Sequence, residues 1–293
     1  MTAPLSTFGL LQRSVDYAGT FPPATLSLSE AVANYAQERS GPRAWLLGRL
    51  VVSASGLDAL ETLLPQPTGD EHEISVILSG DPLPQLARVA AFNQQGVGRA
   101  RVVSVEYPPA AATDIARLTE RQDPSLLRFF ETPLDADLES RLDAIAKARA
   151  AAKVRTGGTV ATAIPEISAV SRFLHGCATR GLAFKATAGL HHAIRNCYSL
   201  TYERDSATAV MHGFLNVSVA AALARRGAPP ADIEEALAES SAGAFEFGPD
   251  GLVYRHYAIG LQDLADTRRH FFRSFGSCSF REPADELAAL HLL

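Results

Sequence analysis

The sequence predicts a (β/α)₈ barrel, and three observations lead to this prediction. Short apolar runs alternate with amphipathic stretches seven times between residues 10 and 189. Such repetition indicates a parallel sheet with right-handed crossovers. The runs are apolar almost throughout, as in a sheet that is covered on both faces. Seven or eight such units in 293 residues fit a closed barrel. A doubly wound open sheet is the alternative, because periodicity does not show closure.

The apolar runs predict strands at 10–19, 44–54, 73–80, 100–109, 126–133, 152–158 and 182–189. Amphipathic patterns that predict helices follow the first six, at 27–40, 56–64, 82–96, 111–121, 136–150 and 164–181. Residues 273–280 and 283–293 then predict the eighth strand and a closing helix. The whole chain, 1–293, is interpreted as one barrel domain.

The regular alternation stops after the seventh strand. Residues 193–272 contain helical patterns at 211–227 and 229–241, and a polar segment at 245–257 that is typical of a hairpin. This stretch is too long for one crossover. We therefore interpret 193–272 as a helix-rich insertion between strands seven and eight. It could cover a pocket as a lid or form a contact in a homo-oligomer.

Composition and charge narrow the class of protein. The chain is 47% hydrophobic and 20% charged, with a net charge of −5, which is ordinary for a globular protein and gives no reason to expect nucleic acid or an anionic membrane as a partner. No apolar run approaches the roughly 18–20 residues of a membrane span, and no secretion signal is evident. Three cysteines without CxxC spacing argue against a structural zinc site. We expect a cytoplasmic protein without metal or cofactor.

Polar residues on several strands are predicted to meet at one end of the barrel. Parallel barrels carry their chemistry at the carboxyl ends of the strands, and alternate residues face the interior. By this parity Lys153 shares a face with Arg155, and Lys185 shares a face with Thr187. Carboxylates lie on three other strands, at Asp16, Glu106 and Glu131. Opposite charges lower each other's burial cost and shift pKa values, which is typical of active sites.

Two lysines in one pocket favour amine chemistry. A lysine is ordinarily protonated at neutral pH, but desolvation and a second cation both favour the neutral amine. The neutral amine can attack a carbonyl and form a Schiff base, which accepts electrons as a carbon–carbon bond breaks. We expect Lys153 to form this imine. Lys185, Glu106 and Asp16 would move protons or orient a water molecule.

The same strands resemble those of the 2-deoxyribose-5-phosphate aldolase family. That family carries its Schiff-base lysine in a Lys-Thr-Ser-Thr-Gly strand, and "KVRTGG" (153–158) is similar. Its later Lys-Ala-Ser/Ala-Gly-Gly-Ile-Arg strand is similar to "KATAGLHH" (185–192), and its Arg-Phe-Gly-x-Ser-Ser strand to "RSFGSCSF" (273–280). The "RFFET" run (128–132) is similar to the end of the family's fifth strand. The resemblance implies a class I aldolase barrel with acids at Asp16 and Glu106.

Several positions depart from the family pattern. Arg155 replaces a small hydroxyl residue, Glu106 is one carbon longer than the usual aspartate, and His191 and His192 stand where the family has Ile-Arg. The family's terminal tyrosine has no match in "AALHLL", and the 193–272 segment has no counterpart. The resemblance therefore implies the barrel and Schiff-base chemistry more than the deoxyribose phosphate substrate.

An anionic end of a small carbonyl substrate would need cationic and backbone N–H donors. Arg155 can bind two oxygens with its guanidinium fork. The turns at 188–190 and 276–279 could expose N–H groups to a phosphate or carboxylate. The expected substrate-binding residues are Arg155, Glu131, Thr187, Gly189, His191, His192, Gly276, Ser277 and Ser279.

Two other functions fit the same residues. One is an isomerase or epimerase, in which Glu106 and Glu131 act as bases or hold a metal ion together with a histidine. The other is a barrel without catalytic activity that binds a ligand or protein through its insertion.

Overall fold

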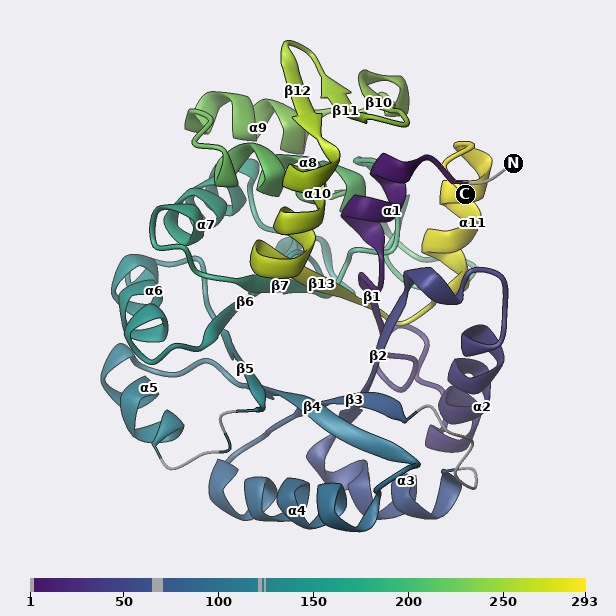
Figure 1. Ribbon diagram of the computed structural model, residues 1–293, viewed down its shortest axis with the longest axis vertical. Coiled ribbons are helices and arrows are strands. Elements are labelled where there is room, and N and C mark those ends of the chain that lie inside the picture. Colours follow the sequence, from purple (N-terminus) through teal and green to yellow (C-terminus); the bar gives the residue numbers. More distant parts are fainter. Residues whose placement is uncertain (1–2, 65–70, 121–122, 124) are drawn as a thin grey trace.

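The computed structural model describes residues 3–64, 71–120, 123 and 125–293. In these residues, eight parallel strands close into a barrel in the order β1-β13-β7-β6-β5-β4-β3-β2, with helices around the outside (Figure 1). The predicted (β/α)₈ barrel is therefore confirmed, and the open-sheet alternative is wrong. The barrel strands are β1 (Val15–Tyr17), β2 (Leu47–Ser53), β3 (His72–Ile77), β4 (Ala100–Tyr107), β5 (Leu127–Glu131), β6 (Ala151–Arg155), β7 (Phe184–Thr187) and β13 (Phe272–Ser277).

One helix follows each barrel strand. These helices are α2 (Leu28–Arg39), α3 (Leu57–Leu63), α4 (Pro82–Gln95), α5 (Ala112–Thr119), α6 (Leu138–Lys147), α7 (Ile167–Thr179), α8 (Phe214–Arg225) and α11 (Arg281–Ala289). Short 3₁₀ turns lie at η1 (Ala44–Leu46), η2 (Ala54–Gly56), η3 (Ala161–Ala163) and η4 (Ala242–Ala244). The helix expected at 111–121 ends at Thr119, and residue 121 lies outside the described residues.

Local sequence explains where several helices begin. Ser27 precedes α2, and its hydroxyl accepts the backbone N–H of Glu30 while the Glu30 carboxylate accepts the N–H of Ser27. This reciprocal pair satisfies two donors that a helix start leaves free. Asp81 accepts the N–H of Leu83 at the start of α4, where Pro82 is the first helical residue.

The first predicted strand, 10–19, is largely wrong. A helix, α1 (Leu5–Leu11), occupies its beginning, and β1 covers three residues, Val15–Tyr17. Leu10 and Leu11 are buried as helix residues. A short apolar run is compatible with a buried helix as well as with a buried strand, so the pattern alone could not distinguish the two.

The segment 193–272 lies between barrel strands β7 and β13, except for Phe272, which is the first residue of β13, and it is more varied than a helical insertion. It contains a hairpin, β8 (Asn196–Ser199) with β9 (Thr208–Met211), and the helices α8, α9 (Pro230–Ala238) and α10 (Leu261–Asp266). The predicted hairpin at 245–257 is part of a three-stranded sheet, β10 (Phe245–Phe247), β11 (Gly251–Tyr254) and β12 (Tyr257–Gly260). A π-helical turn, η5 (Thr267–Phe271), leads into β13.

Part of this segment belongs to the barrel itself. The ring of Phe214 on α8 stacks on Phe275 of β13, with 4.9 Å between centroids, and residues 214–224 are all buried. Helix α8 therefore takes the place of the helix after the seventh strand (Figure 1). Among the described residues, none of the helices combines the length and apolar character needed to cross a bilayer.

The loops after β6 and β7 touch through two glycines. Gly189 has φ +73°, and a Cβ there would lie 2.8 Å from the Cα of Gly157. Only glycine combines this left-handed backbone with so close an approach. The contact fixes the two loops that follow the lysine-bearing strands.

We predict that Gly189→Ala destabilises the protein more than Gly181→Ala does. Gly181 has a similar φ of +60° but no atom within 4 Å of its would-be Cβ, so its substitution costs about 1 kcal/mol of backbone strain. Gly189→Ala adds a backbone clash, for a total of about 3 kcal/mol. Urea denaturation measures both free energies of unfolding. Equal losses for the two variants would contradict the glycine contact.

Candidate active site

Lys153 and Lys185 lie side by side inside the barrel. They are register partners on β6 and β7, and Glu131 of β5 is the register partner of Lys153 on its other side. The two lysines are 3% and 1% exposed. Buried amines of this kind need ionic partners, because an unpaired charge is very costly away from water.

Lys185 is held between two buried carboxylates. Its Nζ lies 2.7 Å from Oδ2 of Asp16 and 2.6 Å from Oε1 of Glu106. Both carboxylates are almost completely buried. The Lys185 ammonium therefore links β7 to β1 and β4 across the barrel interior.

Lys153 is the outer of the two amines. Its Nζ lies 2.9 Å from Oε2 of Glu131 and 3.2 Å from Oε2 of Glu106. Glu106 thus bridges the two lysines with its two oxygens. Glu131, the last residue of β5, is 17% exposed and is the partner that faces water.

Hydroxyl groups and one arginine complete the network. Ser75 donates to Glu106 at 2.8 Å, Ser104 donates to Ser75 at 2.8 Å, and Ser274 donates to Asp16 at 2.6 Å. Arg49 contacts Asp16 twice. One guanidinium nitrogen of Arg49 lies 3.6 Å from Oδ2, and its backbone N–H donates to Oδ1 at 3.0 Å. Three carboxylates therefore face two ammonium groups and one guanidinium, so the formal charges cancel.

The network fixes the protonation of its inner members. Burial raises the pKa of Asp16, but the charges of Lys185 and Arg49 outweigh burial and lower it to about 2. Burial opposes ionisation of Glu106 in the same way, and Lys185 and Lys153 lower its pKa to about 2. Burial lowers the pKa of Lys185, but Asp16 and Glu106 raise it above the ordinary value. At neutral pH these three groups are therefore all charged.

A cavity of about 330 Å³ opens above the lysines. This size suits a small organic molecule. Its walls come from strand ends and loops around the barrel mouth. The lining includes Phe21, Pro22, Pro23, Glu106, Glu131, Lys153, Arg155, Lys185, Thr187, Gly189, His191, Gly276 and Cys278. Asp16 does not line it and lies beneath Lys185.

The predicted anion-binding groups fall into two sets. Arg155, Thr187, Gly189 and Gly276 line the cavity, and Arg155 is exposed. Within the described chain, no ion pair joins Arg155 to a carboxylate, and Glu131 pairs with Lys153 instead. Ser277 is buried and donates to the carbonyl of Ser279 at 2.6 Å, and neither serine lines the cavity.

The adjacent histidines point to different places. His191 lines the cavity and has Nδ1 3.0 Å from Oγ of Ser277 and 3.8 Å from Sγ of Cys278. Burial lowers the pKa of His191 to about 4, so its ring is neutral at pH 7. His192 pairs with Glu286 of α11 at 2.6 Å and stacks on Tyr198, away from the cavity. The structure therefore brings one of the two histidines to the site.

The metal-dependent alternative has no ligand set in the described part of the chain. No group of three or more histidine, cysteine, aspartate or glutamate side chains there has the geometry to hold a metal ion. Glu106 and Glu131, the carboxylates considered for that role, are both in contact with lysine.

The scarcity of lysine is a further strong signal in the sequence. The chain has 27 lysine and arginine residues, and just three of them, Lys147, Lys153 and Lys185, are lysines. Arginine cannot lose its proton in a protein or form an imine, whereas lysine can do both. Two of the three lysines are buried in one pocket, which singles out the chemistry of an amine at that place. Ser75, Ser104 and Ser274 gave no such signal.

Comparison with known proteins adds no family assignment. No protein-family model matches the chain, and no curated protein sequence matches it. The (β/α)₈ barrel is compatible with an enzyme, since this fold carries many different reactions.

We predict that the buried network makes the protein sensitive to acid. The pKa values of Asp16 and Glu106 are lowered to about 2, so they stabilise the fold by about 2 and about 3 kcal/mol above their unfolded-state pKa values of about 4. This stability is lost as the pH falls from about 4 through about 2. Asp16→Asn and Glu106→Gln should each flatten the dependence of the unfolding free energy on pH.

Asp250→Asn serves as a control, because Asp250 is exposed in the turn before β11. Denaturant titrations at a series of acid pH values provide the measurement. If the Asp16 and Glu106 variants keep the wild-type slope, the carboxylates are not ionised in the folded state as described.

Proposed function

We propose that the protein is an aldolase or lyase of the Schiff-base type, in which Lys153 forms an imine with a small carbonyl substrate that bears an anionic group. The observation that carries this proposal is that Lys153 lines the cavity at the barrel mouth and has a partly exposed carboxylate, Glu131, 2.9 Å from its Nζ. The resemblance of residues 153–158 and 185–192 to the 2-deoxyribose-5-phosphate aldolase motifs supports the same choice of residues.

The two lysines receive different roles because their partners differ. Lys185 has Asp16 and Glu106 as partners, both inaccessible to water, and its raised pKa keeps it an ammonium. Lys153 contacts Glu131, which reaches water. A proton can leave Lys153 through Glu131 to solvent, whereas both carboxylate partners of Lys185 are buried. Lys153 is therefore the nucleophile and Lys185 the fixed positive charge.

Imine formation comes first. Lys153 Nζ gives a proton to Glu131 and attacks the carbonyl carbon, and the carbonyl oxygen takes one proton from the attacking nitrogen and one from Glu131 and leaves as water. The resulting iminium accepts the electron pair of the adjacent carbon–carbon bond as the β-hydroxyl group of the substrate gives its proton to Glu131 and that bond breaks, which releases one carbonyl fragment and leaves an enamine. Protonation of the enamine and hydrolysis of the imine return the carbonyl product and the free amine. Glu106, with a pKa of about 2, acts as a fixed negative charge near the iminium.

Residues at the rim of the cavity would bind the anionic group of the substrate. Arg155 presents a guanidinium at the end of β6, two residues from Lys153 on the same strand. Its fork can bind two oxygens of a phosphate or carboxylate. The loops at Gly189 and Gly276 bring backbone close to the same space. The cavity volume of about 330 Å³ limits the substrate to a small molecule.

We predict that sodium borohydride traps a carbonyl compound on Lys153. The protein is incubated with acetaldehyde, pyruvate or dihydroxyacetone phosphate, reduced, digested and analysed by mass spectrometry. A reduced adduct on Lys153 is expected, and Lys153→Met should abolish it. Lys147, an exposed lysine on α6, provides an internal control within the same digest.

The outcome separates the proposal from its rivals. An adduct that forms on Lys153 in the presence of EDTA supports the imine mechanism. If no carbonyl compound in the panel labels Lys153, or if Lys147 is labelled to the same extent, the Schiff-base assignment is wrong.

We also predict that Glu131→Gln slows formation of the adduct on Lys153 by about 100-fold, because general base assistance contributes that much or more. The rate of loss of the unmodified Lys153 peptide at several reduction times measures this effect. Glu246→Gln removes an exposed carboxylate on β10 and should leave the rate unchanged. An unchanged rate in Glu131→Gln would show that another group takes the proton.

A further inference from the structure

The opposite end of the barrel carries a second cavity that the proposed reaction does not use. It measures about 760 Å³ and is lined by residues of α1, α10 and η5 and by early residues of the barrel strands. Arg49 is the third residue of β2, Glu73 the second of β3 and Arg273 the second of β13. The cavity therefore lies at the amino ends of the strands, away from the barrel mouth.

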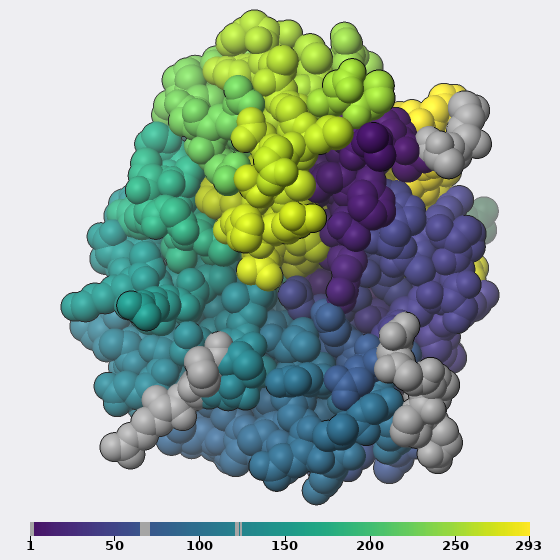
Figure 2. All heavy atoms as spheres, viewed as in Figure 1, coloured from purple at the N-terminus to yellow at the C-terminus, as the bar shows by residue number. Residues whose placement is uncertain are grey.

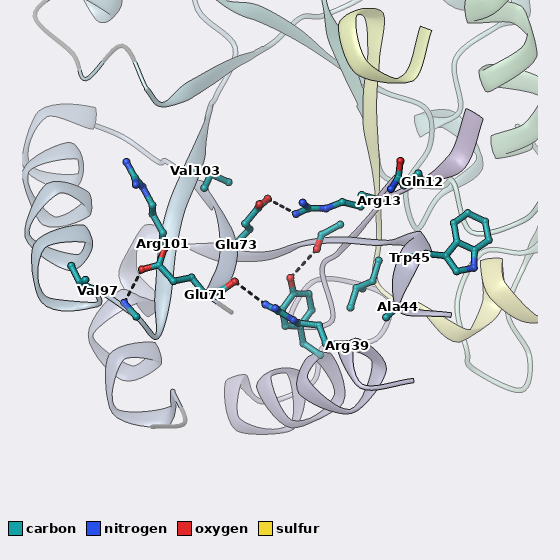
Figure 3. A pocket seen from close by; sticks show the side chains of 14 residues that line it. Gln12, Arg13, Arg39, Ala44, Trp45, Glu71, Glu73, Val97, Arg101 and Val103 are labelled. Carbon is teal, nitrogen blue, oxygen red and sulfur yellow. Dashed lines mark hydrogen bonds and ion pairs between the residues drawn. The ribbon is translucent and has the colours of Figure 1, made fainter. Parts of the chain in front are cut away.

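Basic side chains dominate this cavity. Its lining includes Arg13, Arg49, Arg268, Arg269, His270 and Arg273, against one carboxylate, Glu73. Glu73 already pairs with Arg13 at 2.6 Å. Figure 3 shows the adjoining cavity, where Arg13 points toward Glu73 and both residues form part of the wall. Within the described chain, no ion pair to a carboxylate involves Arg268, Arg269 or Arg273.

Arg13 pairs with Glu73 and Arg49 with Asp16, whereas Arg268 and Arg273 lie near like charges without an ion pair of their own in the described part of the chain. Burial, together with the charges of Arg49, Arg273 and Arg13, lowers the pKa of Arg268 to about 9 against the opposing effect of Asp16. Burial and the charge of Arg49 likewise lower the pKa of Arg273. Like charges held together in a partly buried place destabilise a protein unless an anion joins them.

Two of these guanidinium groups also have one buried nitrogen each without a hydrogen-bond partner among the described residues. Nε of Arg49 and Nε of Arg268 are buried and have no acceptor among the described residues. Arg268 donates through another nitrogen to the carbonyl of Arg13. An unsatisfied buried donor costs free energy, and an anion in the cavity would supply the missing acceptors.

The local backbone is also unusual. The π-helical turn η5 contains Arg268, Arg269 and His270. Such turns are rare in proteins, and many of those that occur lie at functional sites. Figure 2 shows α1 in purple beside α10 in yellow, the two helices whose side chains form the outer wall. Leu5 and Phe8 of α1 and Leu261 of α10 make part of that wall apolar.

We propose that this cavity at the amino ends of the barrel strands binds a small molecule that carries phosphate. Guanidinium forks approach from β2, β13 and η5, and a tetrahedral phosphate presents oxygens in several directions, so it can engage more than one fork. The apolar wall formed by α1 and α10 suits an organic portion attached to the phosphate. This site is separate from the anion-binding groups at the barrel mouth and does not depend on the proposed reaction.

Binding of inorganic pyrophosphate, measured by isothermal titration calorimetry at constant ionic strength, tests the proposal. Saturable binding to the wild-type protein is expected. Arg268→Gln and Arg273→Gln should each weaken it by about tenfold or more, the effect of losing a charge-assisted hydrogen bond. Arg117→Gln is the matched control, because Arg117 is an exposed arginine on α5, remote from this cavity, and its loss should leave the affinity unchanged.

Two further variants complete the test. One shows which cavity binds pyrophosphate, and the other replaces an exposed arginine of the same cavity. Arg155→Gln removes the arginine at the barrel mouth, so unchanged binding in this variant assigns the pyrophosphate to the opposite end. Arg269 is exposed, and Arg269→Gln is expected to fold and to weaken binding even if the variants of more buried arginines do not fold. Absence of saturable binding, or binding that is unaffected at positions 268, 269 and 273, would overturn the proposal.

Discussion

The structure depends on the placement of Lys185 between two buried carboxylates. Its ammonium contacts Asp16 of β1 and Glu106 of β4, and Glu106 in turn contacts Lys153 of β6. Any one of these charges alone would be prohibitively costly in the barrel interior. Together they form a set whose formal charges cancel and whose hydrogen bonds are completed by serines. Strands that are distant in the sequence are thereby tied through their interior side chains.

The same arrangement separates two kinds of group that an imine reaction needs. Lys185 and its two carboxylates are inaccessible and stay charged, so they supply a constant electrostatic environment. Lys153 and Glu131 stand between this interior and the cavity, where a proton can be exchanged with water. Arg49 connects the network to the other end of the barrel, because it contacts Asp16 and also lines the arginine-rich cavity. Both ends of the barrel thus depend on β1 and β2.

Much of the fold could be predicted from the sequence, because each strand from β2 to β6 is a short apolar run followed by a helical pattern. The prediction was wrong for 10–19, where the apolar residues Leu10 and Leu11 belong to a helix. Alternation of side chains along β6 and β7 correctly brought Lys153 and Lys185 to one face, since strand parity is a local property. It did not tell which of His191 and His192 would reach the cavity, because both follow the strand in a loop.

Other features could not be predicted from sequence patterns. The depth of Asp16 below the cavity depends on the stagger between β1 and its neighbours, which no single strand encodes. The arginine-rich cavity combines residues from β2, η5 and β13 whose spacing in the sequence has no period. The scarcity of lysine was visible in the composition, and it would have strengthened the case for Lys153 and Lys185.

The most direct test of the buried network is NMR spectroscopy of protein labelled with ¹⁵N at the lysine side chains, because the chain has just three lysines. We expect a Lys185 ammonium signal that is protected from exchange with water and keeps its charged-state shift above pH 10.5, the ordinary lysine value. We also expect loss of that protection in Asp16→Asn. Three lysine signals that all exchange rapidly and titrate like free lysine would contradict the buried network.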